Sequence, residues 1–111
     1  MKIDKELLKG STSILILSLL EGEDMYGYQI ARTLKEKSDQ IFDMKEGTMY
    51  PMLHGLEDQK AIESYWLDTG NRRRRYYKIT QDGLNLLRHK KDEWQTFTNA
   101  INTVIEYFSH V

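Results

Sequence analysis

The segment IESYWLDTGNRRRRYYKIT at residues 62–80 constrains the fold more than any other part of the sequence. Residues 62–67 are rich in aromatic and β-branched side chains, which favour a strand, and DTGN at 68–71 is typical of a turn. Residues 72–80 then predict a strand that returns along the first one. The chain therefore contains one β-hairpin, and its tip carries a run of four arginines, Arg72 to Arg75.

Alternation along the second strand predicts which side chains of this hairpin face the core. Successive side chains of a strand point to opposite faces. One face then receives Arg73, Arg75, Tyr77 and Ile79, and the other receives Arg72, Arg74, Tyr76 and Lys78. We expect Tyr77 and Ile79 to anchor the hairpin in the core, with the arginines projecting beyond it at the tip.

Positive charge is concentrated around this hairpin although the formal net charge of the chain is only -1. Between residues 72 and 91 the sole acid is Asp82, and the cations are Arg72, Arg73, Arg74, Arg75, Lys78, Arg88, Lys90 and Lys91. Most of the balancing acids lie earlier, between Glu21 and Asp58. A segregated charge of this kind suits nucleic acid or an acidic protein partner, but it also suits a solvated strand edge that resists aggregation.

Three helical segments precede the hairpin. A first helix is predicted from Lys5 to Leu20, apolar around so much of its girth that we expect burial on two sides. Asp24 is the predicted N-cap of a second helix that runs to about Lys37. A third helix is predicted to begin near Glu46.

The third predicted helix has an apolar arc and a nearly uncharged outer arc. At about 100° per residue the apolar arc gathers Met49, Met52, Leu53 and Leu56. Pro51 falls near the first turn, where the missing N–H is tolerated. The outer arc carries Gly47, Pro51, His54 and Asp58, with Thr48 and Tyr50 on its flanks. Its small, weakly charged beginning favours close approach to another surface.

A long last helix is predicted after the hairpin, capped by Thr80 and running to about His110. Its apolar stripe continues far beyond what a domain of this size can cover, so its distal half requires a partner. The predicted dimerisation residues are Trp94, Phe97, Ile101, Ile105 and Phe108. We expect residues 1–80 to form one domain and residues 81–111 to form a C-terminal dimerisation helix.

The order of three helices and a hairpin indicates the fold class: mainly α with a small β-hairpin, a winged helix-turn-helix followed by a long C-terminal helix. In this architecture the third helix enters the major groove of DNA. The sequence also resembles the PadR family of transcriptional regulators over roughly residues 7–87. The resembling segments are LLKGSTSILILSLL, MYGYQIARTLKEKS, KEGTMYPMLHGLE and RRRRYYKIT, with EGTMYPMLHGLE the most specific.

The resemblance implies a dimeric, ligand-responsive repressor of the compact branch with a single C-terminal helix. Two positions depart from the family pattern. Members often carry Arg or Lys at the position of Gly55, so one cationic phosphate contact is expected to be absent. Members also often carry Gly at the position of Lys60, where a left-handed C-cap would cost a non-glycine residue on the order of 1 kcal/mol.

The expected partners are double-stranded operator DNA, a second copy of the chain and a small aromatic inducer. The expected reading surface on the third helix is Thr48, Tyr50, Pro51 and His54. The expected contacts from the hairpin to phosphates or the minor groove are Asn71, Arg72, Arg73 and Arg74. Trp94 is the candidate ligand-binding residue because two symmetry-related indoles would offer stacking faces to a flat ligand. The alternative is that Trp94 simply packs the interface, and Tyr50 has the same alternative as a packing residue.

Other classes of function find little support in the sequence. There is no cysteine, hence no thiol nucleophile and no thiolate metal site, and no His or acid repeats at ligand spacing. No triad or carboxylate pair indicates an enzyme, so no catalytic residue, metal or cofactor is expected. The apolar run at 14–20 is too short to span a membrane, and we expect a cytoplasmic protein. A winged helix that binds protein without DNA, and an RNA-binding arginine run, remain alternatives.

Overall fold

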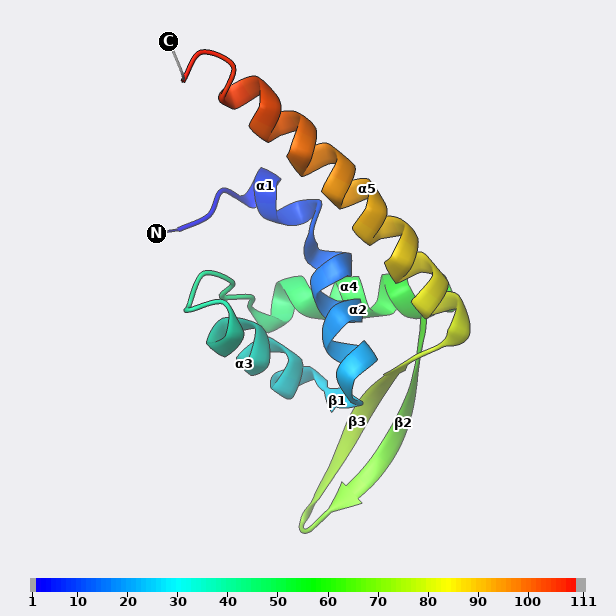
Figure 1. Cartoon of the computed structure of the whole chain (residues 1–111). Coiled ribbons are helices and arrows are strands. Elements are labelled where there is room, and N and C mark those ends of the chain that lie inside the picture. Colours follow the sequence, from blue (N-terminus) through cyan, green and yellow to red (C-terminus); the bar gives the residue numbers. More distant parts are fainter. Residues whose placement is uncertain (1, 110–111) are drawn as a thin grey trace.

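The computed structural model describes residues 2–109. Its helices and strands, in chain order, are α1 (Lys5–Lys9), α2 (Thr12–Gly22), β1 (Met25–Tyr26), α3 (Gly27–Lys37), α4 (Glu46–Asp58), β2 (Ile62–Thr69), β3 (Arg72–Ile79) and α5 (Gln81–Ile105). Figure 1 shows the β2–β3 hairpin projecting from one side of the helical body, while the far end of α5 extends away on the other. The predicted class, mainly helical with a small antiparallel sheet, is confirmed.

The first predicted helix is in fact two helices, α1 and α2, and the prediction of one continuous helix was wrong. The chain breaks at Gly10 and Ser11, two residue types that favour helix ends over helix interiors. The Ser11 hydroxyl donates to the Leu8 carbonyl at 2.9 Å, and the buried Thr12 hydroxyl donates to the same oxygen at 3.1 Å. The Ser11 amide also donates to this carbonyl, at 3.0 Å, so the Leu8 oxygen gathers the local hydrogen bonds that end α1.

The sheet has three strands rather than two. The two-residue strand β1 pairs antiparallel with β3, in the register Met25↔Tyr77 and Tyr26↔Tyr76, and the strand order is β1-β3-β2. A strand this short has no alternation that a sequence pattern can reveal. It replaces the predicted start of the second helix, so the assignment of Asp24 as N-cap was wrong: α3 begins at Gly27, and Asp24 instead accepts a 2.7 Å hydrogen bond from the Tyr65 hydroxyl.

The core lies between α2, α3, α4 and the inner face of the sheet. The largest fully buried side chains are Ile16, Leu17, Leu20, Ile30, Met49, Leu53, Leu56, Ile62, Tyr77 and Leu87. The predicted apolar arc of α4 is confirmed, although Met52 is only half-buried. Tyr77 anchors the hairpin as predicted, with Ile79 packed against the core. Each full burial of a Leu- or Ile-sized side chain contributes about 1.5–3 kcal/mol, so this cluster holds the hairpin base to the helices.

The last helix begins where predicted, because the Thr80 hydroxyl accepts a hydrogen bond from the Gly83 amide at 3.0 Å. It ends at Ile105, earlier than the predicted end near His110, a residue outside the described range. After Ile105 the amides of Tyr107 and Ser109 bond to carbonyls three residues back, which closes the helix with tighter turns. No helix within residues 2–109 combines the length and the apolar character needed to cross a bilayer.

Lys60 adopts the left-handed conformation that its position at the end of α4 predicts, with φ of 61°. The Ala61 amide bonds to the Leu56 carbonyl at 2.9 Å and the Lys60 amide to the Glu57 carbonyl at 2.9 Å, the pattern of a Schellman C-cap. A side chain at this position therefore strains the backbone, whereas glycine would not.

We expect Lys60→Gly to raise the free energy of unfolding by about 0.5–1 kcal/mol, because relief of the left-handed strain exceeds the entropy that glycine adds to the unfolded chain. Urea denaturation measures the change. Gln59→Gly is the matched control: Gln59 has a right-handed backbone, so glycine there should lower stability. Equal destabilisation by both variants would contradict the strain at Lys60.

Candidate nucleic-acid interface

The predicted reading residues lie together on the exposed side of α4. The three inward positions Met49, Leu53 and Leu56 fix the rotation of the helix. Thr48, Tyr50, Pro51 and His54 are consequently turned to solvent. Glu46 is the only charged residue in the first turn of α4, so the exposed side of the helix that follows it is weakly charged.

Tyr50 is held in place by Gly27, the first residue of α3. The Tyr50 ring lies so close to Gly27 that a Cβ there would come within 2.9 Å of the hydroxyl oxygen. Tyr50 still exposes 38% of its surface. Tyr50 can therefore both pack against α3 and contact DNA, because part of its ring lies against Gly27 and the rest is exposed to solvent.

The hairpin, β1, α3 and α4 together line an open cleft of about 810 Å³. Of the predicted site residues, the cleft brings together Tyr50, His54, Arg72, Arg73 and Arg74. Thr48 and Pro51 are exposed on α4 outside its lining, and Asn71 lies at the hairpin turn next to Gly70. The turn itself is only two residues long, and Gly70 takes the left-handed backbone it requires, with φ of 64°.

Seven residues that line the cleft were not among the predicted site residues: Tyr26, Gly27, Tyr28, Arg32, Trp66, Arg75 and Tyr77. Tyr26 belongs to β1, the next three to α3, Trp66 to β2 and the last two to β3. The closely spaced aromatic residues of MYGY at 25–28 were the one available signal, and the sequence analysis did not use their spacing. Tyr28 and Trp66 expose 59% and 55% of their surfaces, which is unusual for large aromatic residues without a partner.

The arginines are not equivalent, because each has a different neighbour. The Arg73 guanidinium lies 4.9 Å from the centre of the Trp66 ring, and that of Arg74 lies 4.4 Å from the Tyr26 ring. Arg72, at the tip, makes no ion pair with any residue in the range 2–109. Stacking on an aromatic face leaves the N–H edges of a guanidinium available to an anion, so Arg73 and Arg74 are oriented yet still able to donate.

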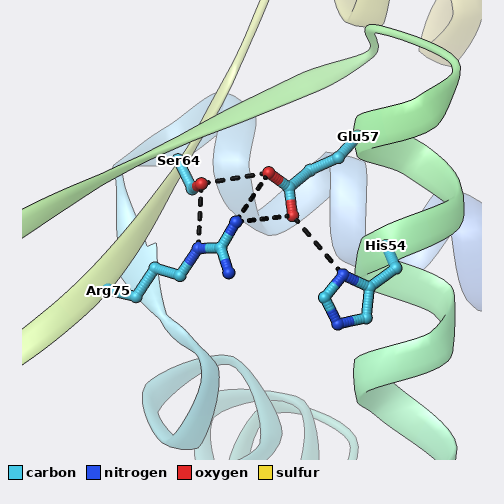
Figure 2. A network of polar contacts seen from close by, with 4 residues as sticks. All are labelled: His54, Glu57, Ser64 and Arg75. Atoms are coloured by element: carbon cyan, nitrogen blue, oxygen red, sulfur yellow. Dashed lines mark hydrogen bonds and ion pairs between the residues drawn. The ribbon is translucent and has the colours of Figure 1, made fainter.

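Arg75 differs from the other three, because its charge is neutralised within the protein. It forms a 3.1 Å ion pair with Glu57 of α4, and Figure 2 shows this pair together with Ser64 and His54. The prediction that all four arginines project from the tip was therefore wrong for Arg75. Its side chain turns toward α4 because an acid is present there within reach.

Two tyrosines of the hairpin have perturbed ionisation. The hydrogen bond to the Asp24 carboxylate raises the pKa of Tyr65, and burial raises the pKa of Tyr77 despite the nearby Arg75 charge. Both hydroxyls are therefore neutral at physiological pH. Within residues 2–109 no group of three His, Asp or Glu side chains gathers to hold a metal ion.

Comparison with known proteins gives a consistent family. The model of the Transcriptional regulator PadR-like family matches residues 16–89. An uncharacterised protein from Lysinibacillus sphaericus is 30% identical over 105 residues, which covers 94% of this chain and 96% of that protein.

Solved structures of regulators share both the fold and the sequence. A transcriptional regulator from Clostridium thermocellum is 34% identical, with a TM-score of 0.84 and coverage of 89% of this chain and 97% of that chain. A PadR family regulator from Eggerthella lenta is 31% identical, with a TM-score of 0.82 and coverage of 91% and 87%. One from Clostridium difficile is 37% identical, with a TM-score of 0.76 and coverage of 86% and 98%.

Proposed function

The chain belongs to the PadR-like family of transcriptional regulators, and on this premise we propose that it is a homodimeric repressor that binds operator DNA sequence-specifically. The family is one of regulators and not of enzymes. The observation that carries the proposal is the basic, aromatic cleft between the exposed side of α4 and the hairpin. A duplex seated against α4 would bring its phosphates to the arginines.

The proposed roles divide between base reading and backbone contact. Thr48, Tyr50, Pro51 and His54 present the surface of α4 that enters the major groove. Asn71 and Arg72 to Arg74 contact phosphates or the minor groove from the hairpin, which acts as the wing. Because position 55 is a glycine and not a cation, the exposed side of α4 is nearly neutral. Most of the electrostatic affinity for DNA therefore comes from the wing.

We expect Arg72→Ala combined with Arg73→Ala to make the plot of log affinity against log salt shallower by up to about 2 units. Each phosphate contact contributes about 0.9 to this slope. Fluorescence anisotropy with a duplex selected from genomic fragments measures it at several salt concentrations.

The matched control is Arg88→Ala combined with Lys90→Ala, which removes the same charge from α5, outside the cleft. This control should leave the slope nearly unchanged. Equal slopes in both folded double variants would place the phosphate contacts elsewhere. Single-stranded RNA and protein-only arms separate DNA binding from the two alternatives: a winged helix that binds RNA, or one that binds an acidic protein without DNA.

The proposed dimer interface is the distal half of α5 together with the turns that follow it. Phe97, Ile101, Ile105 and Phe108 expose 54%, 37%, 70% and 76% of their surfaces. Such a stripe along a helix that overhangs the body in Figure 1 is characteristic of an interface. Leu7 of α1 is also 59% exposed, and it lines the same cavity as Trp94 of α5. A two-fold axis there would set the two DNA-binding domains about one helical turn of DNA apart, ~34 Å.

We accordingly propose that residues 1–80 form the DNA-binding domain and that residues 81–111 form the dimerisation helix. We also propose that the protein is cytoplasmic.

We expect Ile101→Asp combined with Ile105→Asp to convert the dimer into monomers at micromolar concentration, because two carboxylates would have to be buried in an apolar seam. Sedimentation equilibrium measures the oligomeric state. Asn99→Asp combined with Asn102→Asp adds the same charge to exposed positions and should leave the dimer intact. If the isoleucine variant still dimerises as tightly as wild type, the interface lies elsewhere.

Trp94 is the proposed contact for a small aromatic inducer. It is half-buried and lines an apolar cavity of about 310 Å³ together with residues of α1, α2 and the segment after α3. A ligand bound beside Trp94 could splay the tail helices, provided that it favours one spacing of the DNA-binding domains over another. The alternative is that Trp94 only packs the interface.

We expect planar aromatic compounds to quench Trp94 fluorescence saturably in a Trp66→Phe background, and to weaken operator binding over the same concentration range. Trp94→Leu in the wild-type background is the control, in which the compounds should no longer change the affinity for the operator. If a broad panel changes neither signal, Trp94 is a packing residue only.

A further inference from the structure

The carboxylate of Glu57, near the end of α4, is directed at the wing and not at solvent. Figure 2 shows it meeting side chains from both strands. The Arg75 Nη2 donates to Oε2 at 3.1 Å and to Oε1 at 3.3 Å, and the Ser64 hydroxyl donates to Oε2 at 3.0 Å. Arg75 Nε donates to the Ser64 oxygen at 2.9 Å, which closes the ring of contacts.

This ring joins three elements through directional bonds. Glu57 belongs to α4, Ser64 to β2 and Arg75 to β3. The Glu57 side chain is 20% exposed and that of Arg75 is 37% exposed, so solvent screens the ion pair in part and the hydrogen bonds supply its direction. A planar guanidinium that is fixed by both Nε and Nη2 has little rotational freedom, so the ring defines an angle as well as a distance.

The ring lies beside the proposed DNA-binding surface. His54, one turn before Glu57 on α4, has its Nδ1 at 3.9 Å from Glu57 Oε1. The next residues along β3 after Arg75 toward the tip are Arg74 and Arg73, which line the cleft. An acid in this place repels DNA phosphates, so its presence there is costly unless it has another effect on binding.

We propose that Glu57 is a positioning residue, which through Arg75 and Ser64 holds the wing at the angle to α4 that lets both contact one duplex. Arg75 is then a structural cation and contacts no phosphate. This inference rests on the proposed DNA-binding function. The wing is a two-stranded ribbon beyond the short strand β1, so nothing in the sheet alone fixes how far it leans from α4.

The DNA affinity of a Glu57 variant distinguishes a positioning role from a purely electrostatic one, because the two roles change the affinity in opposite directions. Removing an acid near DNA should, by its charge alone, tighten binding. Under the proposal, Glu57→Ala weakens binding about tenfold or more at 0.15 M salt and makes the salt slope shallower by about 1–2 units, because wing contacts are lost. Asp58→Ala, the exposed acid next along α4, is the matched control and should bind as tightly as wild type or more tightly. Glu57→Ala binding as tightly as Asp58→Ala would overturn the proposal.

A second measurement needs no DNA, so it distinguishes failure of this inference from failure of the proposed function. The chain has no cysteine, so Glu46→Cys with Asp68→Cys places spin labels only at the start of α4 and near the wing tip. Pulsed electron resonance, on labelled chain diluted with excess unlabelled chain, should give one narrow distance.

Both Glu57→Ala and Arg75→Gln should broaden or shift this distance, with helical content unchanged by circular dichroism. An unchanged narrow distance in either folded variant overturns the positioning role. If the wild-type chain binds no duplex while both variants still show the broadening, the DNA-binding function is refuted and the positioning of the wing by Glu57 stands.

Discussion

The carbonyl oxygen of Ala61 is the point on which the arrangement of the reading helix, the wing and the tail depends. Its partners are the Thr80 amide and the Thr80 hydroxyl, each at 3.0 Å, and the hydroxyl also donates to the Lys60 carbonyl at 2.6 Å. Gly83 of α5 passes so close that any Cβ there would overlap this oxygen. The end of α4, the base of the wing and the start of α5 thus meet within one residue. Because a closely packed junction transmits strain, a displacement of α5 would reach the end of α4.

Much of this fold could be predicted because its main elements obey strong local rules. The hairpin follows from a Gly-containing turn between alternating strands, and the rotation of α4 follows from the spacing of Met49, Leu53 and Leu56. The left-handed Lys60 was expected at the end of α4. The break at Gly10 and Ser11 was missed because the apolar pattern continues across it, and local hydrogen bonding to Leu8 decided against one continuous helix.

The site was less predictable, because its chemistry depends on partners distant in sequence. Arg75 is identical in type to its three neighbours, and only the folded chain shows that Glu57 lies opposite it. In the same way Trp66 looks like an ordinary strand residue in the sequence. Its contact with the Arg73 guanidinium depends on the register of β2 and β3. Sequence periodicity indicates which face a side chain occupies. It does not indicate which charged residue of another element lies opposite.

In the proposed dimer, the overhang of α5 would make the spacing between the two DNA-binding domains depend on the rotation of the distal stripe about the helix axis. Trp94 is half-buried in a cavity against α1 and α2, while the apolar side chains beyond it on α5 are exposed as far as Ile105. One residue inserted between these regions would rotate the distal stripe by about 100° and move it ~1.5 Å. Seven inserted residues would nearly restore the phase and lengthen the tail by ~10.5 Å. In a dimer joined through this stripe, changes in tail length are therefore tolerated only in near-whole turns, so divergence in operator spacing among such chains should proceed in discrete steps.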